Sequence, residues 1–198
     1  MSASVAHVPH IVLASGSPRR RDLLEALGIE YEVVVSRYHE DNELKSYPSR
    51  VVMTHAQRKV QDVAPRVKRG VVVGADTIVY YQRRIFGKPR DLQEARDMLR
   101  TLQGRTHAVY TGLALYDVTQ DKLAVDYVRT RVVMRALDAS EIDRYFQLVD
   151  PLDKAGAYAI QEAAGVIIER VEGCYYNVIG FPVAKLDEML RGLGYALL

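Results

Sequence analysis

The sequence predicts a mixed α/β fold, and three observations carry this prediction. In the first half of the chain, short apolar runs typical of strands alternate with segments that have helical spacing. Further on, two long strand-type runs follow each other directly, which favours a mixed sheet over a purely parallel one. No repeat, low-complexity tract or linker interrupts the chain, so we expect one domain over residues 1–198, with 1–9 as a disordered extension.

The expected strands are runs rich in Val, Ile, Leu and Tyr. They lie at 10–14, 31–35, 71–81, 107–117 and 123–134. Gly74 and Asp76 interrupt the third run, and the arginine pair at 83–84 favours a turn back through residues 85–87. A polar turn joins the last two runs, as in adjacent antiparallel strands.

The expected helices are identified by apolar spacing and by capping residues. They cover about 17–28, 49–63, 91–104, 138–149 and the chain from 182 onward. Ser17 is an N-cap with Pro18 at the first helical position, and Gly28 ends this first helix. Asp91 and Asp138 are each followed three residues later by glutamate, the pattern of a capping box.

Composition excludes several classes of function. Lys and Arg total 27 against 25 Asp and Glu, so the net charge of +2 argues against a binder of nucleic-acid polymers or of membrane surfaces. Cys174 is the single cysteine, which excludes an intramolecular disulfide and fits a reducing compartment. The N-terminus lacks a signal-peptide pattern, and no apolar run approaches the ~20 residues of a membrane helix. We expect a soluble, cytoplasmic protein.

Three arginines at 19–21 crowd the first turn of a helix, where each cation costs up to about 1 kcal/mol against the helix dipole. Ser15, Gly16 and Ser17 precede them and offer hydroxyls, exposed N–H groups and a free φ angle, which together favour a bound phosphate. Arginines there would fork around phosphate oxygens. The alternative is that they only extend into solvent. Neither a Walker loop nor a GxGxxG fingerprint is present.

Two acids and two lysines are candidates for phosphate chemistry. Asp76 lies within an apolar run, where a carboxylate is costly to bury unless it is paired or binds a metal; the alternative is that it caps or turns the strand end. Glu40 either shares that metal or is a solvated acid. Lys59, near the apolar side of its helix, and Lys88, in a Gly-Lys-Pro turn, either serve the phosphate or extend their ammonium groups to solvent.

Six motifs carry a resemblance to a known family. They are LASGSPRR (13–20), GADTIV (74–79), GKPRD (87–91), HAVYTG (107–112), LDKAGAYAIQ (152–161) and YYNVIGFP (175–182). In their order and spacing the chain resembles the Maf family of nucleoside triphosphate pyrophosphatases, over about residues 11–192. The resemblance implies an elongated, twisted mixed sheet flanked by helices, similar to the inosine triphosphatase type, with a cleft between two lobes. It also implies a homodimer.

The resemblance further implies metal-dependent hydrolysis of a nucleoside triphosphate to the monophosphate and pyrophosphate. Five matching residues would contact or neutralise phosphate: Ser15, Arg19, Arg20, Lys59 and Lys88. Glu40 and Asp76 would bind Mg²⁺ or Mn²⁺, and Asp76 would accept a proton from the attacking water.

Specificity positions of the family match Arg19, Thr77 and Gln161. The motif at 152–161 resembles the branch that acts on dTTP and UTP, and Gln161 offers the donor and acceptor that suit the amide edge of thymine or uracil. Alternatively, Gln161 only bonds backbone groups in a turn. Glu162 follows where the family commonly has glycine, so the loop shape and the base preference stay open.

Two other functions remain open from sequence. One is a pyrophosphatase for another modified nucleotide, such as 7-methyl-GTP. The other is a nucleotide-binding regulator of septum formation without turnover, which would need the anion cradle but not Asp76. Pyrophosphate release across a nucleotide panel distinguishes them.

Overall fold

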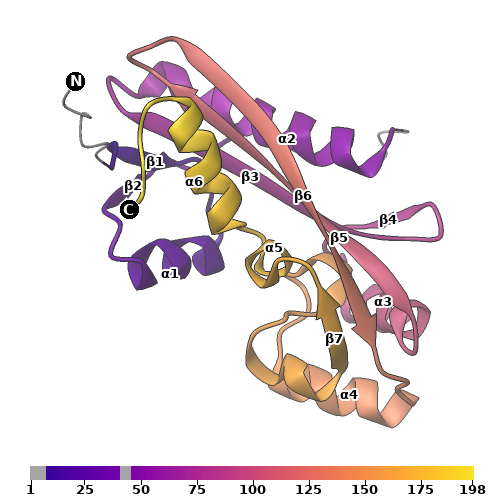
Figure 1. The fold of residues 1–198 in the computed structure, drawn as a ribbon. Coiled ribbons are helices and arrows are strands. Elements are labelled where there is room, and N and C mark those ends of the chain that lie inside the picture. Colours follow the sequence, from indigo (N-terminus) through magenta and orange to yellow (C-terminus); the bar gives the residue numbers. More distant parts are fainter. Residues whose placement is uncertain (1–7, 41–45) are drawn as a thin grey trace.

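One mixed sheet forms the frame of the molecule in the computed structural model, which describes residues 8–40 and 46–198 except for the side chains of 162 and 164 (Figure 1). Its seven strands are β1 (Ile11–Leu13), β2 (Tyr31–Val33), β3 (Val71–Tyr81), β4 (Arg84–Phe86), β5 (Thr106–Asp117), β6 (Lys122–Met134) and β7 (Ile168–Glu172). The order is β2-β1-β3-β5-β6-β7, with β4 paired to β3. Strands β1, β2 and β3 pair in parallel and the other pairs are antiparallel, so the predicted mixed sheet is confirmed.

Within the described ranges, helices form at the five places that the caps and apolar spacing predict, and one further short helix, Tyr175–Ile179, was not among those expected. The α-helices are α1 (Pro18–Ala26), α2 (Pro48–Val63), α3 (Leu92–Leu102), α4 (Ala139–Leu148), α5 (Tyr175–Ile179) and α6 (Val183–Gly192). Short 3₁₀ turns are η1 (Ala64–Arg66), η2 (Ala155–Ala157) and η3 (Glu162–Val166). Asp138 forms the complete capping box. At α3 only half of it forms, because the Glu94 carboxylate accepts from the Arg90 N–H instead.

Two parts of the chain need separate mention. The expected disordered extension, residues 1–9, lies outside the described residues except for positions 8 and 9. Within the described ranges, no helix combines the length and apolar character that a membrane span requires.

Two apolar clusters lie at opposite ends of the long strands β3 and β5, and the elongated shape follows from this (Figure 1). One cluster joins the start of β3 to α1 and α6. The other joins the end of β3 to α3 and α4. Asp76 lies between them, in the middle of a strand that continues without interruption from Val71 to Tyr81. The alternative that Asp76 caps or turns a strand end is therefore wrong.

Helix α2 packs directly across β3 and β5, and two glycines permit this approach. A Cβ at Gly74 would lie 2.7 Å from the carbonyl oxygen of Ala56, and one at Gly112 would lie 2.4 Å from the backbone of Val52. Because both strands present hydrogen atoms there, the helix backbone comes close enough to bring Lys59 to the level of Asp76.

Candidate active site

A cavity of about 750 Å³ opens between the two apolar clusters. That volume is within the range of small-molecule sites. All ten residues predicted for the site line it: Ser15, Ser17, Arg19, Arg20, Glu40, Lys59, Asp76, Thr77, Lys88 and Gln161. Among the described residues, its lining includes five basic side chains (Arg19, Arg20, Lys59, Lys88, Lys154) and three acidic ones (Glu40, Asp76, Asp153). The excess of positive charge favours an anionic ligand.

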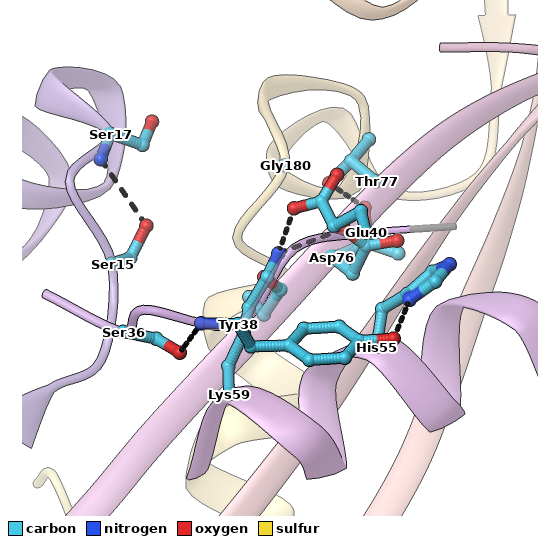
Figure 2. Close-up of polar contacts among 12 residues, drawn as sticks. Ser15, Ser17, Ser36, Tyr38, Glu40, His55, Lys59, Asp76, Thr77 and Gly180 are labelled. Carbon is cyan, nitrogen blue, oxygen red and sulfur yellow. Dashed lines mark hydrogen bonds and ion pairs between the residues drawn. The ribbon is translucent and has the colours of Figure 1, made fainter. Parts of the chain in front are cut away.

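Lys59 forms the centre of the site (Figure 2). Its Nζ donates to Asp76 Oδ1 at 2.9 Å and to the Ala75 carbonyl oxygen at 3.0 Å, and it lies 2.5 Å from Glu40 Oε1. A lysine ammonium has three N–H donors, so these acceptors use all of them. Lys59 thus joins three segments: helix α2, strand β3 and the chain that follows β2.

The carboxyl groups of Glu40 and Asp76 have opposite pKa shifts. Burial, together with the charge of Glu40, raises the pKa of Asp76, although Lys59 opposes this. Partial burial acts in the same direction on Glu40, but the charge and hydrogen bond of Lys59 lower its pKa below the usual range. Neighbouring acids with divergent pKa values are typical of sites in which one stays ionised while the other exchanges a proton.

Asp76 Oδ2 is buried and meets no hydrogen-bond donor in the part of the chain that the structure describes. Such an oxygen, close to the carboxylate of Glu40, is a suitable ligand for a hard divalent cation. The described residues contain no group of three or more His, Cys, Asp or Glu side chains placed to hold a metal. The pair of Asp76 and Glu40 is a donor set that could hold Mg²⁺ or Mn²⁺, and Mg²⁺ commonly takes one or two carboxylates and completes its shell with water and substrate phosphate.

The turn between β1 and α1 contains the predicted phosphate-binding residues. Ser15 Oγ accepts from the Ser17 N–H at 3.2 Å (Figure 2). It also accepts from Arg20 Nη1 at 2.8 Å. Ser17 is the N-cap of α1, but its hydroxyl makes no capping bond. Gly16 does not adopt a positive φ, and a Cβ there would make only ordinary contact with Val35, so the expected use of its φ freedom is wrong.

Arg20 is buried against the sheet, and the protein itself takes up most of its donors. Its guanidinium donates to the carbonyl oxygens of Gly180 and Ala75 at 2.9 and 3.0 Å and to the hydroxyl of Ser15. A longer contact of 3.4 Å reaches Thr77 Oγ1. Burial lowers the pKa of Arg20. These bonds fasten the turn between β1 and α1 to β3.

The remaining predicted residues differ in how firmly they are held. Thr77 Oγ1 shares a hydrogen bond of 3.0 Å with Thr111 Oγ1. Lys88 is exposed, and no ion pair or hydrogen bond holds its ammonium among the described residues. Gln161 is half-buried at the cavity wall. Glu162 stands where the family commonly has glycine, and its side chain lies outside the described residues.

Three further residues at the cavity were not predicted from sequence. Asp153 accepts from Arg19, 134 residues away. The Tyr38 hydroxyl is 2.9 Å from His55 Nδ1, which fastens the segment that carries Glu40 to helix α2 (Figure 2). Tyr158 lies on the wall with its hydroxyl 2.6 Å from His107 Nε2. Arg19 is far in sequence from Asp153, and Tyr38 is 17 residues from His55, so spacing does not predict either contact. The only sequence signal for Asp153 and Tyr158 is that both lie in the motif at 152–161.

Comparison with known proteins decides the family. A family model described as "Maf-like protein" matches residues 10–193. The chain belongs to the Maf family. The resemblance read from the six motifs is thereby confirmed.

Curated relatives of this Maf protein carry a more specific name. A protein from Dictyoglomus thermophilum named "dTTP/UTP pyrophosphatase" is 43% identical over 189 residues, or 95% of this chain and 98% of the relative. One from Pelotomaculum thermopropionicum with the same name is 45% identical over 188 residues, with the same coverage. Among solved structures, a nucleoside-triphosphatase / dITP/XTP pyrophosphatase from Mycobacterium abscessus matches with a TM-score of 0.40 and 17% identity, over 66% of this chain and 75% of that chain.

Proposed function

We propose that this protein hydrolyses dTTP and UTP to the nucleoside monophosphate and pyrophosphate. The observation that carries the proposal is the cluster of Asp76, Lys59 and Glu40. This cluster shares its cavity with further basic side chains, and the chain belongs to the Maf family. The name that these relatives share, dTTP/UTP pyrophosphatase, supports the choice of substrate.

Glu40 and Asp76 would hold a divalent cation, Mg²⁺ or Mn²⁺, with the unbonded Oδ2 of Asp76 as one ligand or as the proton acceptor. Such a cation would neutralise charge that develops on the phosphoryl oxygens. Lys59 holds the other oxygen of Asp76 and so fixes the orientation of the carboxylate. The raised pKa of Asp76 brings its basicity closer to that of an effective general base.

The triphosphate would extend from this cluster toward the N-terminus of α1. Helix N–H groups, the hydroxyls of Ser15 and Ser17 and the guanidinium of Arg19 are the donors at that end. Lys88 adds a further cation to the lining of the cavity, and Arg20 supports the turn through its hydrogen bond to Ser15. Water would then attack in line at a phosphorus of the anhydride between the α- and β-phosphates. The P–O bond of that anhydride would break, and these donors would stabilise the departing pyrophosphate.

The base would lie at the wall that carries Gln161, with Thr77 and Arg19 as the other specificity positions. An amide side chain can donate and accept at once, as the edge of thymine or uracil requires. A homodimer and a cytoplasmic location, both expected from the sequence, stay predictions.

Pyrophosphate release across dTTP, UTP, CTP, GTP and 7-methyl-GTP, with Mg²⁺ or Mn²⁺, tests the function. We expect turnover of dTTP and UTP above the others. Preference for 7-methyl-GTP would contradict the assignment of the base while leaving the phosphate chemistry in place. Tight nucleotide binding without release would contradict the enzyme and favour a nucleotide-binding regulator.

A further inference from the structure

Asp153 lies between two cations at the edge of the cavity. Its Oδ2 accepts from Arg19 Nη1 at 2.8 Å, and its backbone carbonyl oxygen accepts from Arg19 Nη2 at 3.0 Å. Its Oδ1 accepts from Lys154 Nζ at 2.7 Å, and the same ammonium donates to the carbonyl oxygen of Asp150 at 2.8 Å. The contact therefore joins the first turn of α1 to the segment that begins at residue 150.

This contact fixes Arg19 without using up its donors. A guanidinium has five N–H groups. Two of them bond to Asp153, and the other three meet no acceptor among the described residues. Arg19 differs in this from its neighbour Arg20, whose donors go to the carbonyl oxygens of Gly180 and Ala75 and to hydroxyls. Arg19 is thus oriented by the protein and still able to bond an anion.

Lys154 makes the anchor rigid. Only 6% of its side chain is exposed, compared with 43% for Asp153. Partial burial raises the pKa of Asp153, but the hydrogen bond from Lys154 and the charge of Arg19 outweigh this and lower it, so the carboxylate stays ionised. The single negative charge of Asp153 contacts two cations, Arg19 and Lys154, so this group of three side chains keeps a net positive charge at the cavity.

We propose that Asp153 is a positioning residue that orients Arg19 toward the triphosphate and links it to the segment 153–161, which carries Gln161. The inference rests on the proposed function only in taking Arg19 as a phosphate contact. Asp153 itself touches no reacting atom.

The direction in which Asp153→Ala changes the affinity for a polyphosphate distinguishes a positioning role from a simple effect of charge. Removing a carboxylate near a polyphosphate would strengthen binding if only charge mattered. Removing a positioning residue weakens it instead. For Asp153→Ala we expect Kd for inorganic tripolyphosphate and KM for dTTP to rise about tenfold, the scale of one lost charge-assisted hydrogen bond, with kcat changed less than threefold.

Asp143→Ala is the matched control, because Asp143 forms a 2.7 Å ion pair with Arg96 between two helices and does not line the cavity. It should leave Kd and KM unchanged. The Arg96–Asp143 pair is partly exposed, so the unfolding temperature of Asp143→Ala should fall by no more than about 2–4 °C. Asp153→Ala also removes one acceptor from the buried Lys154 ammonium, so its unfolding temperature should fall further, and both variants are compared at a temperature at which they are folded.

A double-mutant cycle isolates the action through Arg19. In an Arg19→Ala background, Asp153→Ala should add no further loss of tripolyphosphate affinity. Four results would each overturn the inference. Asp153→Ala could lose equal affinity with and without Arg19→Ala, bind tripolyphosphate more tightly than the unaltered protein or bind it with unchanged affinity, or the unaltered protein could fail to bind tripolyphosphate. Tripolyphosphate binding is measured by calorimetry and needs no turnover. If nucleotides bind but none is hydrolysed, the proposed function fails while Asp153 is still tested.

Discussion

Lys59 Nζ holds Asp76 Oδ1 at 2.9 Å, while the other oxygen of that carboxylate meets no donor among the described residues. One oxygen is therefore fixed and the other is left for chemistry. Glu40 contacts the same ammonium, and Lys59 lowers the pKa of Glu40. The negative charge of Glu40 in turn helps to raise the pKa of Asp76. The site thus has one acid that stays ionised and one suited to accept a proton.

A first prediction concerns the stability cost of this arrangement. Because the folded-state pKa of Asp76 is raised, the folded protein binds more protons than the unfolded chain, and Asp76 lowers stability as pH rises above its unfolded pKa of about 3.9. Asp76→Asn should therefore unfold at a higher urea concentration than the unaltered protein at pH 7, with the difference shrinking toward pH 4.

Asp117→Asn is the control of opposite sign. Asp117 accepts from the Thr119 N–H and the Tyr195 hydroxyl, both at 2.8 Å. Burial raises its pKa, but these bonds outweigh burial and lower it, so its contribution is present above the unfolded pKa and is lost as pH falls through the folded one. This variant should be less stable at pH 7. A destabilised Asp76→Asn variant would contradict the account of Asp76.

A second prediction concerns the close approach of α2 to the sheet. A Cβ at Gly74 would meet Ala56 O and Val60 Cγ2, both at 2.7 Å, so Gly74→Ala should displace the helix that carries Lys59. Overpacking of this kind costs about 1–3 kcal/mol, and we expect lower activity as well. Gly192→Ala, where the added carbon would meet no atom within 4 Å apart from adjacent residues and its own helix backbone, should change urea unfolding and activity little. Equal behaviour of the two variants would contradict the packing argument.

A third prediction concerns the segment that carries Glu40. Tyr38→Phe removes the hydroxyl that bonds His55 Nδ1, so Glu40 should lose part of its fixed position. One hydrogen bond corresponds to about 0.5–1.5 kcal/mol, and kcat/KM should fall by up to about tenfold. Tyr31→Phe removes an exposed hydroxyl that bonds Glu25 and should leave kcat/KM unchanged. If Tyr38→Phe behaves like that control, the anchor is unnecessary.

A fourth prediction concerns Lys88, which lines the cavity without a described partner. Since no ion pair holds Lys88 among the described residues, Lys88→Ala should raise KM for the nucleotide and leave the unfolding temperature unchanged. Lys68→Ala, at an exposed position away from the cavity, should change neither. Unchanged KM in the Lys88 variant would remove that lysine from the site.

Much of the fold followed from local signals. Capping residues such as Ser17 and Asp138 and the apolar run at 71–81 are properties of neighbouring residues, and the elements form where they predict. All ten residues predicted for the site line one cavity, eight of them from the six motifs and two, Glu40 and Lys59, from outside the motifs. The phosphate and metal roles assigned to them stay predictions.

Tertiary partners could not be predicted in the same way. The sequence predicts that Arg20 forks around phosphate, but the hydrogen bonds of its guanidinium go to protein groups such as the Gly180 carbonyl oxygen, 160 residues away. Lys59 was expected to serve phosphate, and its three donors go to protein oxygens. Such partners depend on how distant segments meet, which neither spacing nor composition encodes.

Pyrophosphate release from dTTP by Asp76→Asn, with Asp143→Asn as the control, tests the central claim most directly. The account predicts that the Asp76 variant stays folded and binds nucleotide while kcat falls about 10²–10⁴-fold, the range for a lost general base, and that the control keeps full activity. A kcat for Asp76→Asn within a few-fold of the unaltered protein would contradict the assignment of Asp76 to the reaction.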